Sequence, residues 1–153
     1  MTEHHFNRTV CACADCTACC KRQPGPLAPG DFERIVDHLA KAQNVTPEVA
    51  LEQAKTQFCA SPGALVQRVS GQVVRVGTIT PQMKKGRCVF LDENDRCSIH
   101  AVAPFGCAYF DTHMNRAQAM ERSVWLVHQQ ATTEYQQLRL TLPYARTYKP
   151  SAY

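Results

Sequence analysis

Apolar residues recur at helical spacing along the chain from residue 31 onwards. Four of them would share one face of a helix: Phe32, Ile35, Val36 and Leu39. Asp31 is placed to cap the start of this helix, and Asn44 is placed to end it. The pattern therefore predicts a helix with one buried face between these two residues.

A second helix is predicted immediately afterwards. Thr46-Pro47-Glu48 supplies an N-cap, a proline at the first helical position and an acidic residue in the first turn. Four residues of this helix face the same way: Ala50, Leu51, Ala54 and Phe58. Pro62-Gly63 is expected to break the helix.

Residues 64–110 change to a pattern that is typical of strands. Ser70-Gly71 is the predicted turn of a hairpin, because β-branched residues flank it on both sides: Val66, Val69, Val73, Val74, Val76 and Ile79. A second hairpin is predicted from the short apolar runs 88–91 and 96–99. If it turns at Glu93-Asn94, Phe90 faces Cys97, and Cys88 lies diagonally from Cys97 on the same face. That spacing suits two ligands of one site better than a disulfide.

A longer helix is predicted from about Asn115 to Leu140, and Pro143 ends it. One apolar stripe runs along it and is expected to be core or a surface for a partner helix: Ala117, Met120, Val124, Val127, Ala131, Tyr135 and Leu138. These elements predict an α+β fold. We expect one small domain at residues 11–142, preceded by an N-terminal segment at 1–10 and followed by a tail at 143–153.

The amino-acid composition changes this prediction, because the chain has few large apolar residues with which to build a core. Leu, Ile, Val and Phe together number 31 of 153 residues, whereas the chain holds nine cysteines. A disulfide framework or a metal site is therefore expected to help hold the fold. The N-terminus lacks the pattern of a secretory signal, so a cytoplasmic location is expected. In that compartment, closely spaced cysteines are more often metal ligands than disulfides.

The spacing of the cysteines indicates metal binding. The string Cys13-x2-Cys16-x2-Cys19-Cys20 resembles zinc knuckles, and it also repeats part of the ferredoxin run that holds an iron–sulfur cluster. Three more cysteines follow the predicted helices, which gives seven expected ligands: Cys13, Cys16, Cys19, Cys20, Cys88, Cys97 and Cys107. Seven thiolates exceed the four that one zinc ion or one cubane needs. Zinc and an iron–sulfur cluster both remain open.

These cysteines and their neighbours together resemble a known family. The string at residues 13–20 is followed by Gly86-Arg-Cys-Val-Phe-Leu-Asp92, Cys97-Ser-Ile-His100 and Pro104-Phe-Gly-Cys107. This order is similar to the YkgJ-type CxxCxxCC cysteine-cluster proteins, and the resemblance implies chelation of zinc or iron. The family usually has Tyr-x-x-Arg-Pro before its last cysteine, whereas Ala103 stands here in place of the arginine. That departure removes the basis for a role that depends on a cation beside the cluster.

Other sulfur and imidazole side chains have simpler interpretations. Cys11 is expected to be a solvent-facing thiol in the same loop rather than an eighth ligand, and Cys59 is expected to pack in the core. His100 could complete a site with three cysteines, but packing is the favoured interpretation. His4 and His5 lie near the N-terminus, where disorder is expected.

The predicted function is therefore metal binding, with a structural, redox or metal-handling role. The resemblance extends to a cluster in flagellin lysine methylases, so a subunit of a cluster-dependent transferase is one alternative. An enzyme is not favoured, because the chain has no Gly-rich nucleotide loop and no Ser/His/Asp arrangement. A zinc module that binds a protein partner or nucleic acid is another alternative. The net charge of +4 is too small to imply nucleic acid by itself, so nucleic acid is not the expected partner, and no apolar run is long enough for a membrane span.

Overall fold

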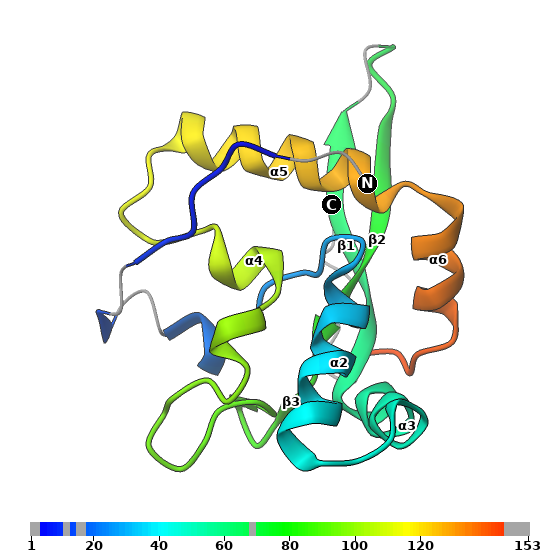
Figure 1. The fold of residues 1–153 in the computed structure, drawn as a ribbon. Coiled ribbons are helices and arrows are strands. Elements are labelled where there is room, and N and C mark those ends of the chain that lie inside the picture. Colours follow the sequence, from blue (N-terminus) through cyan, green and yellow to red (C-terminus); the bar gives the residue numbers. More distant parts are fainter. Residues whose placement is uncertain (1–3, 11–12, 15–17, 68–69, 146–153) are drawn as a thin grey trace.

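The computed structural model describes residues 4–10, 13–14, 18–67 and 70–145. These residues form, in chain order, η1 (Ala18–Lys21), α2 (Asp31–Gln43), α3 (Pro47–Gln57), β1 (Phe58–Gln67), β2 (Val73–Pro81), β3 (Met83–Lys84), β4 (Arg87–Cys88), η2 (His100–Val102), α4 (Phe105–Ala108), α5 (Arg116–Gln130) and α6 (Thr133–Leu140). Helices surround two small antiparallel sheets, so the fold is α+β as predicted (Figure 1). Within the described ranges, no helix has the length and apolar character that a bilayer crossing needs.

The first two long helices begin and end almost where the sequence predicted. α2 ends at Gln43 and is followed by its C-cap Asn44, whose φ of 52° is left-handed, and α3 is capped by the side chain of Thr46. The N-cap of α2 is Gly30, with a φ of 88°, so the prediction of Asp31 as the cap was wrong. Asp31 is instead the first residue of the helix, and its buried carboxylate binds other partners.

Strands β1 and β2 form the predicted first hairpin, and Gly71 lies in its turn with a φ of 85°. Two details of the prediction were wrong. Phe58 begins β1 and does not belong to α3. Pro62-Gly63 does not end a helix, because the pairing register shifts between Ser61 and Ala64 and makes this dipeptide a bulge within the strand.

The predicted second hairpin is replaced by a smaller one. β4 pairs with β3, and this pairing places Cys88 opposite Met83. Leu91 rather than Phe90 lies opposite Cys97, in an isolated antiparallel bridge. The predicted register was therefore wrong by one residue, and such a shift moves side chains to the opposite face.

The loop between these residues explains the shift. Asp92 Oδ1 accepts hydrogen bonds from the N–H groups of Asn94 (2.8 Å) and Arg96 (2.9 Å). Asp95 follows in a left-handed conformation, with a φ of 60°. These local bonds satisfy the backbone within the loop, so residues 92–96 form a compact Asx-type turn rather than the tip of a hairpin at residues 93–94.

The long C-terminal helix of the prediction is two helices, α5 and α6. Thr132 caps α6 with its side chain, and this cap separates the two elements. The buried face of α5 carries Leu126 and Gln130 rather than the whole predicted stripe. Met120 and Val124 are 52% and 47% exposed, so these two residues are not core, and the alternative of a surface for a partner helix stays a prediction.

Tyr135 connects α6 to β2 and to the segment that precedes α2. Its hydroxyl donates a hydrogen bond to the carbonyl of Leu27 (2.7 Å) and accepts one from the N–H of Ile79 (2.9 Å). The N–H of Leu27 in turn donates to the carbonyl of Ile79 (2.8 Å). Burial raises the pKa of Tyr135 to about 12, so the phenol remains protonated at neutral pH.

The N-terminal segment packs against α4 and α5 (Figure 1), so the expectation of disorder at His4 was wrong. Phe6 contacts a second core cluster, and Thr9 donates a backbone hydrogen bond to Ala108 (2.8 Å). The His4 ring lies 4.7–5.3 Å, between centroids, from three aromatic rings: Phe105, Tyr109 and Trp125. This packing explains how residues 4–10 are held although few of them are apolar.

Acidification should loosen this segment. Burial lowers the pKa of His4 below 6.5; Asp31 opposes the shift, whereas His5 and Arg122 add to it. The folded state therefore favours neutral His4, so its stabilising contribution is complete above pH 6.5 and is lost as the pH falls below that value. The emission of Trp125, the single tryptophan, should report this loss between pH 7.5 and 5. The His4→Phe variant should not show the transition, and an unchanged transition in that variant would contradict this assignment.

Candidate metal centre

The structure describes the side chains of five of the seven predicted ligands: Cys13, Cys20, Cys88, Cys97 and Cys107. Cys13 is exposed, Cys88 is buried, and the other three are half-buried. Cys11, Cys16 and the side chain of Cys19 lie outside the described residues.

Three of these cysteines contribute to the main apolar cluster or pack against it. Cys88 belongs to the main apolar cluster, and both Cys20 and Cys97 pack against that cluster. η1, which carries Cys20, contacts β4, which ends at Cys88. The fold thus draws together cysteines from three separate segments of the sequence.

One carboxylate connects these three segments directly. Asp95 lies two residues before Cys97 and forms ion pairs with Lys21 (2.8 Å) and Arg87 (2.5 Å). Lys21 follows Cys20, and Arg87 precedes Cys88. Hydrogen bonds from Lys21 and Arg87 hold the pKa of Asp95 below its usual range, so the carboxylate stays charged at neutral pH.

Cys107 is positioned from the other side by the connector between η1 and α2. The N–H of Gly25 donates to Cys107 Sγ at 3.2 Å, and a donor of this kind favours the negatively charged form of sulfur. The two backbones cross closely, because the N–H of Gly106 also donates to the carbonyl of Pro26 (2.8 Å). A Cβ on Gly25 would lie only 2.1 Å from the carbonyl carbon of Gly106. Glycine is therefore required at this crossing.

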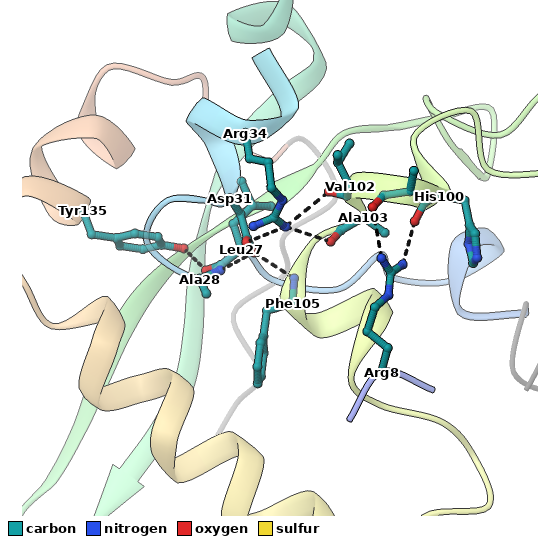
Figure 2. Close-up of polar contacts among 11 residues, drawn as sticks. Arg8, Leu27, Ala28, Asp31, Arg34, His100, Val102, Ala103, Phe105 and Tyr135 are labelled. Atoms are coloured by element: carbon teal, nitrogen blue, oxygen red, sulfur yellow. Dashed lines mark hydrogen bonds and ion pairs between the residues drawn. The ribbon is translucent and has the colours of Figure 1, made fainter. Parts of the chain in front are cut away.

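Beside this crossing, Asp31 joins the segment before α2 to the start of α4 (Figure 2). Its Oδ2 accepts hydrogen bonds from the N–H groups of Ala28 and Phe105, both at 2.8 Å, and its Oδ1 pairs with Arg34 at 2.9 Å. Burial raises the pKa of Asp31, although the two backbone donors and Arg34 oppose that shift. Because Phe105 begins α4, this carboxylate sets the position of the short helix that carries Cys107.

Two arginines bind the carbonyl groups of the segment before α4 (Figure 2). Arg8 donates to His100 (2.7 Å) and Ala101 (3.0 Å), and Arg34 donates to Ala103 (3.4 Å). Positive charge is therefore present beside this segment, although Ala103 replaces the arginine of the family pattern. The His100 side chain is exposed, so the expectation that it packs in the core was wrong.

Sequence reasoning missed His113. Its Nε2 lies 3.4 Å from Cys13 Sγ, and its backbone N–H is held by Asp111 Oδ1 at 2.9 Å. Its position six residues after Cys107 is the feature of the sequence that could have indicated a histidine near the cysteines. Cys59, by contrast, is 4% exposed with its Sγ 3.5 Å from Thr80 Oγ1, which confirms its predicted place in the core.

The donor set fits zinc or iron by its chemistry, since both metals bind thiolate sulfur. In the part of the chain that the structure describes, however, no three His, Cys, Asp or Glu side chains are grouped so that they could hold an ion. The described geometry brings cysteine-bearing segments together without completing a coordination sphere.

Removal of the Asp31 carboxylate should destabilise the fold. Asp31→Ala leaves the N–H groups of Ala28 and Phe105 without their acceptor, so urea denaturation should show a loss of about 2–4 kcal/mol. Asp31→Asn should lose clearly less, because its carbonyl oxygen can still accept both bonds. Asp37→Asn, exposed on the same helix, is the matched control. Equal losses for Asp31→Ala and the control would contradict the assigned role.

Gly25→Ala should separate the crossing backbones. The added Cβ must displace Gly106, so the free energy of unfolding should fall by about 1–3 kcal/mol in chemical denaturation. Gly71→Asn is the control, because the hairpin turn leaves open space there and asparagine tolerates a left-handed backbone. Similar small losses in both variants would show that the crossing is not tight.

Comparison with known protein families matches residues 12–137 to the CxxCxxCC family, described as a "putative zinc- or iron-chelating domain". No curated protein and no solved structure matches the chain significantly. The matched segment covers most of the chain and includes all seven cysteines that the spacing indicated. The chain therefore belongs to the CxxCxxCC family.

Proposed function

We propose that this protein holds an iron–sulfur cluster or zinc through seven thiolates: Cys13, Cys16, Cys19, Cys20, Cys88, Cys97 and Cys107. Family membership carries the proposal, because the matched segment contains every one of these residues and the family is described by zinc or iron chelation. The metal would have a structural, redox or metal-handling role in the cytoplasm. Residues 11–142 would form the metal-binding domain.

The described contacts support a shared site. Cys20, Cys88 and Cys97 lie against one apolar cluster, and Asp95 joins the residues that flank them. The N–H of Gly25 favours negative charge on Cys107. Cys16 and Cys19 would supply ligands in addition to those whose side chains are described.

The charge of the chain supports coupling between metal binding and folding. The formal charge of +4 counts each cysteine as a neutral thiol, and deprotonation of seven thiols changes it to −3. Thiolates gathered without a cation repel one another, so metal entry would relieve a local excess of negative charge. Two divalent ions would return the charge to +1.

The chain's own residues perform the positioning. Lys21, Arg87 and Asp95 hold the segments that carry Cys20, Cys88 and Cys97, whereas Asp31 holds the helix that carries Cys107. A bound zinc ion would hold four ligands in a fixed tetrahedral arrangement, and a bound iron–sulfur cluster would supply one-electron redox chemistry.

Metal analysis of anaerobically purified protein tests the proposal. We expect either visible absorption with iron and acid-labile sulfide, or a colourless protein with about two zinc ions per chain. Removal of the metal by a chelator should lower the melting temperature, because metal binding energy contributes to folding. A protein with neither metal at a stoichiometric level would overturn the proposal.

Cysteine variants locate the ligands. Cys97→Ser and Cys107→Ser should lower metal content markedly, because each removes one thiolate. Cys59→Ala is the control, since Cys59 is a core thiol in contact with Thr80. Full metal content in all single variants of the seven ligands would rule out this ligand set.

A further inference from the structure

A cavity of about 910 Å³ lies between the β1–β2 sheet, α5 and the connector at residues 22–26. Its volume lies within the range of small-molecule sites, which is roughly 300–1,000 Å³. Cys59 lines it, whereas the five proposed metal ligands whose side chains are described do not. The cavity is therefore separate from these described ligands.

The described charges that line this cavity are positive. Among the described residues, the charged side chains of the lining are Arg22 on the connector and Arg75 on β2, and no aspartate, glutamate or lysine lines it. Arg75 Nη1 donates to the carbonyl of Gly63 (2.8 Å), which holds this guanidinium at the cavity while leaving its other nitrogens available. Guanidinium groups without acidic neighbours favour a carboxylate or a phosphate and disfavour a cation.

The buried part of the lining offers additional polar groups. Gln130 is 3% exposed, and its Nε2 donates to the carbonyl of Leu27 (3.0 Å) and to Thr78 Oγ1 (2.7 Å). No donor among the described residues reaches its Oε1. The amide of Gln130 lines the cavity, where its oxygen can accept a hydrogen bond from a ligand hydroxyl or N–H group.

The rest of the lining is largely apolar. It includes side chains from α5, from the segment after α4 and from the β2–β3 junction, namely Leu126, Val127, Phe110, Met83 and Pro81. An aliphatic or aromatic body would bury its surface against these residues, which is the usual composition of a small-molecule site.

We propose that this cavity binds an organic anion with an apolar body, either a carboxylate or a phosphate monoester. Arg22 and Arg75 would bind the charged group, and Leu126 and Val127 would contact the apolar body. Gly25 and Gly106 also line the cavity, and the N–H of Gly25 bonds to Cys107. A ligand would therefore contact the backbone that positions one proposed metal ligand.

Calorimetric titration of the purified full chain, with its metal content measured, tests this site. The probes are 2-naphthoate, 1-naphthyl phosphate, neutral 2-naphthalenemethanol and inorganic phosphate. We expect at least one naphthyl anion to bind with one-to-one stoichiometry and about tenfold more tightly than the alcohol and than inorganic phosphate. The preferred anion identifies the headgroup as carboxylate or phosphate.

Substitutions of lining residues test whether the anion binds in this cavity. Arg22→Gln combined with Arg75→Gln should weaken the anion about tenfold or more, whereas Arg116→Gln, an exposed arginine on α5 outside the lining, should not. Ser123→Trp should block binding by filling the cavity, with circular dichroism to confirm folding. If Ser123→Trp does not fold, the arginine variants decide the result.

Three results would overturn the proposal: no binding of either naphthyl anion, equal binding of the neutral alcohol, or undiminished binding by the double arginine variant. The titration is independent of the metal proposal, because it measures anion affinity rather than metal content. Failure of one proposal can therefore be distinguished from failure of the other.

Discussion

The buried carboxylate of Asp31 is the interaction on which the arrangement of this fold depends. It satisfies two backbone N–H groups that lie 77 positions apart in the chain, at Ala28 and Phe105. A neutral apolar residue could not perform this role, because buried N–H groups need an acceptor. The connector, the first turn of α2 and the start of α4 are consequently fixed to one another. The close crossing of Gly25 and Gly106 lies within the same region.

Asp95 has a parallel role at the surface, where it joins the segments around Cys20, Cys88 and Cys97. Exposed ion pairs of this kind contribute little to stability on their own, since water screens them. Their importance here is geometric, because they select which segments lie side by side. A thin apolar core leaves much of the alignment to such polar contacts, and a metal that binds the same segments would strengthen an arrangement that the charges already favour.

The sequence predicted those features that depend on local chemistry. Asn44 and Thr46 end and begin helices because their own backbones and side chains satisfy the helix termini. Features that depend on tertiary contacts were missed. The apolar stripe continues past Thr132, so it gave no sign that the side chain of this residue caps a new helix. The hydrogen bonds of the Asx-type turn at Asp92 replace the hairpin that strand propensity predicted at residues 93–94. The packing of His4 requires rings that lie about a hundred residues away. The cysteine spacing predicted the family correctly. No local pattern predicts the contact between His113 and Cys13 or the presence of the cavity, because both depend on segments that are distant in the sequence.

The hydrogen bond from Leu27 to Ile79 has a further consequence for the architecture. The chain leaves the cysteine-bearing region at Leu27, forms α2, α3 and the first hairpin, and returns to the same point at Ile79. This excursion is closed at its base, so its length does not determine the distance between the two groups of cysteines. Insertions, deletions or a circular permutation within its outer turns, such as the hairpin end at Gly71, are therefore compatible with an unchanged placement of the thiols. The first hairpin is therefore a site where the chain can be lengthened without a change in the placement of the cysteines.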